Sequence, residues 1–261
     1  MFRSNAVKAR LRAGEPVFGL SHALANSTVA EMIGLAGFDF VLIDGEHGIG
    51  HDQDHLHCLQ ALAGTGARAF LRVSCNDPVV LKRALDLGVE GIMVPNVSNA
   101  AEALAVVSGC RYPPEGIRGF AATGVRASDY GLQGKRYLKE YESELLIAVM
   151  IESRVGVENA AAIAAVDGVD VIQIGVNDLS YDLGVPDNPD HPRLRDAVAG
   201  VEKAALDAGK WLGGAPYAAT GVAALIERGY HLITLGRDVG LLGGALSALL
   251  ERAKVEAARA V

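Results

Sequence analysis

Aromatic residues and cysteines are both scarce in this chain. Only 5% of its residues are aromatic although 50% are hydrophobic, so a folded core must be built mainly from aliphatic side chains. The three cysteines form no CxxC pair and are too few for a disulfide framework. We therefore expect buried or unreactive thiols at Cys58, Cys75 and Cys110.

Positive charge is also in short supply. The chain carries 31 acidic against 24 basic side chains, a formal net charge of −7, whereas a nucleic-acid partner favours a basic face. No apolar run reaches the roughly 18 residues that a membrane span needs, and no charged-then-apolar leader opens the chain. The sequence predicts a soluble, cytoplasmic protein that binds small molecules, with no nucleic-acid partner and no membrane partner.

Short apolar runs alternate with amphipathic segments along all 261 residues. The runs are continuous rather than alternating, as in parallel strands that are buried on both faces. Eight strand-then-helix units without a spare strand fit a closed barrel, for which about 250 residues is a typical length. We predict an α/β fold, a single (β/α)8 TIM barrel over residues 1–261, with strands at Val17–Leu20, Phe40–Asp44, Ala69–Val73, Gly91–Pro95, Leu146–Ile151, Val171–Gly175, Trp211–Ala215 and Leu232–Gly236.

Start and stop signals support these helical segments. Helix starts are predicted at Asn26-Ser27-Thr28, at Asn76-Asp77-Pro78 and at Ser98-Asn99, where a cap residue precedes the apolar pattern. Glycines that can close a helix in a left-handed conformation stand at positions 37, 88 and 229.

One connection is abnormally long. Residues 96–144 separate the fourth and fifth strands, and prolines and glycines within 111–119 prevent this stretch from forming one plain helix. Two interpretations remain open: a surface excursion, or a loop that covers the active end of the barrel.

Polar side chains gather where the predicted strands end. Asp44 ends the second strand and is followed by Glu46 and His47, and Glu152 directly follows the fifth strand. Asn177 and Asp178 come just after the sixth strand. Because catalytic groups of such barrels lie at the carboxyl ends of the strands, these side chains are expected to converge.

Glu152 and Asp178 stand at the ends of adjacent strands. Hard carboxylate oxygens suit Mg²⁺ or Mn²⁺, and a small number of protein ligands leaves room for water and substrate. The alternative is a pair of solvated loop acids. Their position favours a metal site.

Arg72 and His47 are the remaining candidates. An arginine within the third strand needs an anion, either a substrate carboxylate or a neighbouring acid in a structural salt bridge. His47 suits a general base because its ordinary pKa lies near 6.5, although a lone histidine is often structural. His51, His55 and His57 are interpreted as surface residues of the following helix; a metal site formed by His51 and His55 would lack an evident carboxylate.

Lysines give a negative result. None of the seven lysines stands at the carboxyl end of a predicted strand, and Lys210 precedes the seventh strand. A Schiff-base mechanism is therefore not expected, which leaves a metal to stabilise an enolate. A phosphate loop of the GxxxxGK[ST] type is absent, and the Gly213-Gly214 pair is interpreted as tight packing.

Taken together, these motifs resemble the HpcH/HpaI family of metal-dependent class II pyruvate aldolases. The resemblance covers nearly the whole chain. It rests on Leu42-Ile43-Asp44-Gly45-Glu46-His47, Leu71-Arg72-Val73, Asn76-Asp77-Pro78, Arg111-Tyr112-Pro113-Pro114-Glu115-Gly116-Ile117-Arg118-Gly119, Ile151-Glu152, and Gly175 with Asp178-Leu179-Ser180.

The resemblance implies a role for each matching position. Glu152 and Asp178 would hold a divalent metal (Mg²⁺, Mn²⁺ or Co²⁺), which a 2-oxo acid would bind. Arg72 would stabilise the enolate oxygen, and His47 would move a proton with Asp44 as an orienting acid. Backbone N–H groups would receive the substrate carboxylate at Gly175, Val176 and Asn177.

Further implications concern assembly. Asp86 matches an acid tied to the histidine, but it lies before the fourth strand and would serve only across a subunit interface. The family is typically a hexamer, a trimer of dimers, whose last helix packs on a neighbouring barrel. An apolar face suited to this homo-oligomer is offered by Leu241, Leu242, Leu246, Leu249 and Leu250.

Three departures from the family pattern stand out. Met150 replaces a glutamine that relatives carry two residues before the metal glutamate, which would remove a polar contact near bound pyruvate. Val176 replaces a proline, a change that backbone binding of a carboxylate would survive. Ser21 or His22 stands where a tryptophan is common, which would make that wall more polar.

We expect reversible aldol cleavage of a 4-hydroxy-2-oxo acid to pyruvate, or a related 2-oxo acid, and an aldehyde. Two alternatives remain open. The same enolate chemistry would serve an oxaloacetate decarboxylase or a lyase acting on a CoA thioester. The chain would instead be a non-catalytic metabolite-binding barrel if Met150 has abolished turnover.

Overall fold

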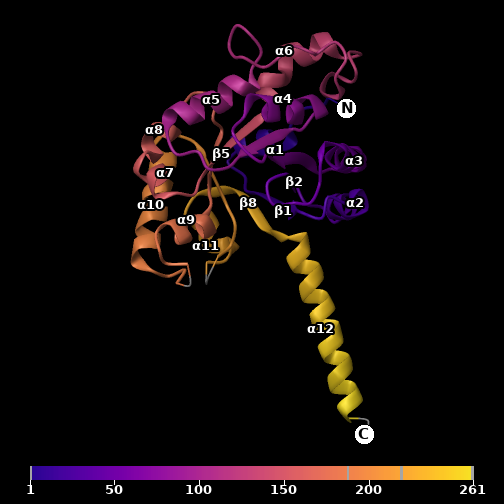
Figure 1. Ribbon diagram of the computed structural model, residues 1–261, viewed down its shortest axis with the longest axis vertical. Helices are drawn as coiled ribbons and strands as arrows, with labels where there is room; N and C mark the ends of the chain where they lie inside the picture. Colours follow the sequence, from indigo (N-terminus) through magenta and orange to yellow (C-terminus); the bar gives the residue numbers. More distant parts are fainter. Residues whose placement is uncertain (1, 187, 218–219, 260–261) are drawn as a thin grey trace.

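The computed structural model describes residues 2–186, 188–217 and 220–259. Within them, eight parallel strands pair in sequence order and close into a barrel (Figure 1). All eight predicted strands are confirmed, with ends shifted by at most two residues. Their bounds are β1 Val17–His22, β2 Phe40–Asp44, β3 Arg68–Arg72, β4 Gly91–Val94, β5 Leu146–Ile151, β6 Val171–Ile174, β7 Trp211–Gly214 and β8 Tyr230–Arg237.

Helices follow the strands and surround the barrel (Figure 1). Their bounds are α1 Ala6–Arg12, α2 Ser27–Leu35, α3 Asp52–Leu62, α4 Pro78–Leu87, α5 Ala100–Cys110, α6 Gly134–Glu144, α7 Arg154–Glu158, α8 Ala160–Ala164, α9 Val176–Asp182, α10 Pro192–Asp207, α11 Val222–Glu227 and α12 Asp238–Arg259, with a short 3-10 turn at Arg126–Ser128. None of the described helices is long and apolar enough to cross a membrane.

The predicted start signals are confirmed at three helices. The side chains of Asn26, Asp77 and Asn99 accept hydrogen bonds from backbone N–H groups of the first turn, which have no partner within the helix. The φ angles of Gly37, Gly88 and Gly229 are 94°, 84° and 90°, a region that favours glycine.

The interior of the barrel is closed at the amino ends of the strands. Phe40 and Phe70 stack there at 5.1 Å between ring centroids, and Val7 and Leu11 of α1 pack into the same cluster. A β-carbon at Gly91 would lie 2.5 Å from the Phe70 ring, so a larger residue at position 91 would clash with this ring. Entry to the barrel is therefore left at the carboxyl ends.

The long connection between β4 and β5 lies at the amino end of the barrel. Helix α5 first carries the chain from the carboxyl ends back to the amino ends, so everything between α5 and β5 remains on that side (Figure 1). Arg126 accordingly donates to the carbonyl oxygen of Leu87, at the end of α4. The hypothesis of a loop over the active end of its own barrel is wrong, and the surface excursion is confirmed.

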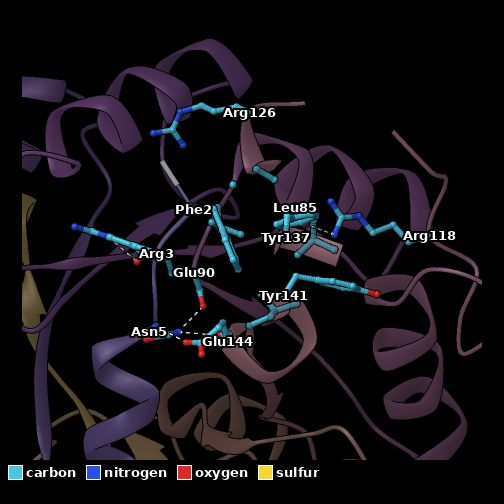
Figure 2. Close-up of a pocket in the computed structure, with 14 residues that line it drawn as sticks. Phe2, Arg3, Asn5, Leu85, Glu90, Arg118, Arg126, Tyr137, Tyr141 and Glu144 are labelled. Atoms are coloured by element: carbon cyan, nitrogen blue, oxygen red, sulfur yellow. Dashed lines mark hydrogen bonds and ion pairs between the residues drawn. The ribbon is translucent and has the colours of Figure 1, made fainter. Parts of the chain in front are cut away.

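A small cavity of about 40 Å³ lies beneath this connection, with room for a few water molecules. Figure 2 shows Tyr137, Tyr141 and Arg118 along one part of it and Asn5 with Glu144 along another. The Asn5 amide donates to the carbonyl oxygens of Glu90 and Glu144 at 2.8 and 2.9 Å. These hydrogen bonds join the amino-terminal segment to the barrel. The cavity between them is too small for a substrate.

Helix α12 projects away from the barrel (Figure 1). Asp238, its first residue, is the only buried position among its described residues. Five leucines of this helix are more than half exposed, namely Leu241, Leu242, Leu246, Leu249 and Leu250. Contiguous exposed apolar surface of this kind is typical of interaction sites.

Candidate active site

A cavity of about 480 Å³ opens at the carboxyl ends of the strands, and we call it the mouth cavity. Its size is typical of a small-molecule site. It is lined by Ser21, Leu42, His47, Arg72, Met93, Met150, Gln173, Ile174, Gly175, Val176, Asn177, Asp178, Ala215, Pro216, Tyr217, Thr234, Gly236 and Arg237. None of the described lysines is among them, in agreement with the sequence prediction.

Arg72 reaches this cavity from β3 and binds two acids from β2 and the loop after it. Its Nε and Nη2 donate to the two oxygens of Asp44 at 3.0 and 2.6 Å, and its Nη1 lies 2.8 Å from Oε2 of Glu46. The structural salt bridge considered above is therefore present. A guanidinium has more N–H groups than these three contacts use, so Arg72 can still serve a ligand.

Asp44 is 1% exposed and holds the loop that carries His47. Its Oδ1 accepts from the backbone N–H of Glu46 and of His47 at 3.2 and 3.1 Å. Burial raises the pKa of this carboxyl, but the hydrogen bond and charge of Arg72 and the two backbone N–H groups outweigh burial, and the pKa is lowered. Asp44 is thus a fixed anion between a guanidinium and the loop.

His47 lies on the rim of the mouth cavity. Its side chain is 57% exposed, and its Nε2 is 3.8 Å from Oε2 of Glu46. The backbone of His47 is anchored to Asp44 while the imidazole remains accessible, which is an arrangement suited to exchanging protons with a ligand.

Glu152 directly follows β5, and Asp178 lies in the first turn of α9, near enough for its charge to act on Glu152. Glu152 is 8% exposed, and its Oε1 accepts from the backbone N–H of Asn96 at 2.7 Å. A β-carbon at position 175 would lie 2.4 Å from Oε2 of Glu152, so Gly175 leaves the space that the carboxylate occupies.

The pKa of Glu152 is raised to about 7. Burial is the largest cause; the charges of Asp178 and Glu46 raise it further, whereas the N–H of Asn96 and the charge of Arg72 lower it. A bound cation would relieve the repulsion between these carboxylates. Their oxygens are hard ligands of the kind that Mg²⁺ and Mn²⁺ prefer. The described residues contain no group of three or more such ligands, so the chain would supply two.

The remaining substrate-binding candidates are only partly available. The N–H of Gly175 donates to the carbonyl oxygen of Ile151 at 3.1 Å and cannot also receive a ligand carboxylate without losing that bond. Val176 and Asn177 begin α9, where backbone N–H groups have no partner within the helix. The predicted carboxylate site is thereby reduced to these two residues.

Asp86 does not lie in this cavity. It is near the end of α4, where its Oδ1 accepts from Nη2 of Arg118 at 2.8 Å. Arg118 is fully buried and stacks on Tyr112, with its guanidinium carbon 4.5 Å from the ring centroid. Asp86 therefore belongs to the amino end of its own barrel, as predicted.

Two histidines differ from the sequence interpretation. His55 is 6% exposed rather than on the surface, because its ring packs under the glycines at 45 and 50. His22 is fully buried behind β1, where its Nδ1 lies 2.7 Å from Oδ2 of Asp238. Ser21, not His22, forms the polar wall of the mouth cavity.

Sequence reasoning missed Arg237 and Gln173. Arg237 ends β8, and its Nη2 lies 3.3 Å from Oδ2 of Asp44. The position rule that selected Arg72 applies equally to Arg237, which follows the predicted strand Leu232–Gly236. Gln173 stands inside β6, two residues before Gly175, so strand alternation alone points it inward.

Comparisons with known proteins find relatives along nearly the whole chain. A family model for HpcH/HpaI aldolase/citrate lyase matches residues 18–245. The chain is 40% identical over 252 residues to a 4-hydroxy-2-oxo-heptane-1,7-dioate aldolase of Salmonella arizonae, covering 95% of this chain and 94% of that one.

Two crystal structures show the same fold. An HpcH/HpaI aldolase/citrate lyase family protein from Burkholderia cenocepacia superposes with a TM-score of 0.90 at 33% identity, covering 96% of this chain and 100% of that one. An HpcH/HpaI aldolase from Desulfitobacterium hafniense gives 0.88 at 28% identity, covering 97% of each chain. The resemblance seen in the sequence is confirmed: the chain belongs to the HpcH/HpaI aldolase/citrate lyase family and is a carbon–carbon lyase.

Proposed function

We propose that this enzyme catalyses reversible, metal-dependent aldol cleavage of a 4-hydroxy-2-oxo acid to pyruvate, or a related 2-oxo acid, and an aldehyde. The observation that carries the proposal is that Asp178 and Arg72 line one cavity, while the Glu152 carboxylate lies against Gly175 of the same cavity and is affected by the charge of Asp178. Relatives that are named for cleavage of such an acid support it.

Glu152 and Asp178 would hold the divalent cation, Mg²⁺, Mn²⁺ or Co²⁺. When bound, it supplies positive charge that lowers the free energy of the enolate of the 2-oxo acid. Arg72 would donate its remaining N–H groups to the oxygen that becomes negative, and the backbone N–H groups of Val176 and Asn177 would bind the carboxylate.

His47 would move the proton between the 4-hydroxyl group and solvent. Its accessible ring and its anchored backbone support this role, with Asp44 fixing the loop. Asp86 would act only in the mouth cavity of a neighbouring subunit. A hexamer in which α12 packs on a neighbouring barrel would also cover the exposed leucines of that helix.

The position of Arg237 favours a substrate whose aldehyde part carries a carboxylate. Asp44 already accepts from Arg72 and from two backbone N–H groups, so Arg237 is not needed to neutralise it. Arg237 is nearly half exposed, with a side-chain exposure of 46%, and it lines the cavity on β8, away from Glu152 on β5. A guanidinium there suits the second carboxylate of a dioate such as the one for which the Salmonella relative is named.

The test is pyruvate release from 4-hydroxy-2-oxo acids by the purified enzyme. Release should cease with a chelator and return with Mn²⁺, Mg²⁺ or Co²⁺. Glu152→Gln and Asp178→Asn should each abolish this recovery. Full activity in chelator, or release of CoA from a thioester in place of pyruvate release, would contradict the proposal.

A further inference from the structure

Gln173 is a buried amide with no hydrogen-bond partner in the part of the chain that the structure describes. Its side chain lines the mouth cavity, the residue is 7% exposed, and its Oε1 accepts no hydrogen bond from any described residue. An unsatisfied buried polar atom lowers the stability of the folded state, so a folded protein seldom keeps one without a use for it.

The strands place this amide beside the candidate metal carboxylate. Gln173 pairs with Met150 in the register between β6 and β5, and Glu152 lies two residues beyond Met150 on the same face. Gln173 and Gly175 share a face of β6 in the same way, and the Glu152 carboxylate lies against Gly175. The amide is therefore one layer below that carboxylate, toward the floor of the cavity.

A glycine on the next strand makes room for the amide. Gly213 pairs with Gln173 across β6 and β7, and a β-carbon at Gly213 would lie 2.3 Å from Oε1 of Gln173. Thr234 of β8, on the far side of β7, also lines the cavity and has a buried hydroxyl without a partner among the described residues. Gln173 and Thr234 thus place two polar side chains along the wall of the mouth cavity, each with an oxygen that has no partner among the described residues.

We propose that Gln173 is a positioning residue that hydrogen-bonds the 2-oxo acid fragment at the floor of the mouth cavity. Rotation about its last side-chain bond presents either the amide NH₂ to a ligand oxygen or Oε1 to a ligand hydroxyl. Arg72 and the start of α9 hold the same fragment from the rim, so the amide fixes its orientation. This inference rests on the proposed function for the identity of the ligand.

The test replaces the amide by a side chain of similar length. Gln173→Met should weaken pyruvate binding, measured by calorimetry with Mn²⁺ present, by about tenfold to a hundredfold, the equivalent of one lost hydrogen bond. KM for the 4-hydroxy-2-oxo acid should rise with it, more than kcat falls. The melting temperature should stay the same or rise, because an unsatisfied polar atom has been removed, whereas loss of a merely structural residue lowers it.

A swap variant and a surface control complete the experiment. Met150→Gln combined with Gln173→Met returns an amide from the neighbouring strand and should recover most of the lost affinity. Gln60→Met, an exposed glutamine of α3, should bind pyruvate as the wild type does.

Each outcome bears on one proposal or the other. Wild-type affinity in a folded Gln173→Met variant, no recovery in the swap, or no pyruvate binding by the wild type would each overturn the role of Gln173. If the wild type binds pyruvate through Gln173 but cleaves no 4-hydroxy-2-oxo acid, the proposed function fails and the inference about Gln173 stands.

Discussion

Arg72 donates hydrogen bonds from Nε and Nη2 to the two carboxylate oxygens of Asp44, at 3.0 and 2.6 Å. This ion pair joins β3 to β2 at the entrance of the mouth cavity. The pair is buried, so removal of one partner leaves an uncompensated charge. A single arginine therefore serves both the fold and the proposed chemistry, and experiments on it must separate the two.

Arg72→Lys should keep the fold and lose most activity. Lysine retains the charge beside Asp44 but cannot reproduce the two-pronged contact or aim further N–H groups at a ligand. We expect kcat to fall by about 10²–10³-fold, the scale of a lost oxyanion donor, with a small change in melting temperature. Arg72→Ala should instead lower the free energy of unfolding by about 3–5 kcal/mol, and with it the melting temperature. Near-normal kcat in Arg72→Lys would reject the assigned role.

Arg237→Leu should change which aldehydes are accepted. With pyruvate as donor, kcat/KM for an aldehyde that carries a carboxylate should fall by about 10–100-fold relative to a neutral aldehyde of equal length, because one charge-assisted contact is lost. The measurement is the ratio of the two kcat/KM values in the synthetic direction. Arg195→Leu, an exposed arginine of α10, is the matched control. An unchanged ratio in Arg237→Leu would argue against a carboxylate at this position.

Asp238 predicts an acid-sensitive contribution to stability. Burial raises the pKa of its carboxyl, but the N–H groups of Ala23, Leu24 and Val239 and the ring of His22 outweigh burial, so the pKa is lowered in the folded state. As pH falls below the unfolded value of about 3.9, the unfolded chain binds the proton first and stability is lost.

Asp238→Asn should therefore show a shallower loss of unfolding free energy below about pH 4, measured by urea denaturation at stepped pH. The exposed Asp207→Asn variant, which removes a surface pair with Lys203, is the control. Identical slopes in wild type and Asp238→Asn would contradict the prediction.

Charges on the apolar face of α12 should break the proposed assembly. Leu246 and Leu250 are four residues apart and share a face, and both are more than half exposed. Replacing both by glutamate should reduce the mass measured by light scattering to that of one chain. Glu251→Ala, in the exposed pair with Lys254, should leave the mass unchanged. A wild-type protein that is itself monomeric at micromolar concentration would refute this use of α12.

The strand pattern predicted the barrel well because each strand is a continuous apolar run between clear helix signals. The sequence pattern did not decide at which end of the barrel the long connection lies. Helix α5 could have decided it, because a segment that follows this helix starts at the amino ends of the strands. The fate of His55 depends on tertiary packing beneath the loop at 45–50, which no local pattern reveals.

The position of a candidate residue at the carboxyl ends of the strands was predictable where a polar residue ends or follows a strand, as at Asp44, Glu152 and Asp178. Arg237 obeys the same rule and was overlooked, whereas Gln173 hides inside an apolar run. The proposed role of Gln173 would also offset the loss expected from Met150, since the two residues pair in the sheet. Pairing across strands, not order along the chain, brings these two residues together.

The amino-terminal segment packs at the closed end of the barrel, where the Phe2 ring meets Tyr137 at 5.1 Å between centroids. A purification tag or fluorescent fusion attached there would stand opposite the substrate entrance of its own barrel, but close to Asp86, which is proposed to act in a neighbouring mouth cavity. The same addition after α12 would burden the helix on which the proposed assembly depends. Immobilisation through the first residues accordingly keeps the entrance of a single barrel accessible, whereas in the proposed assembly both ends of the chain lie at subunit contacts.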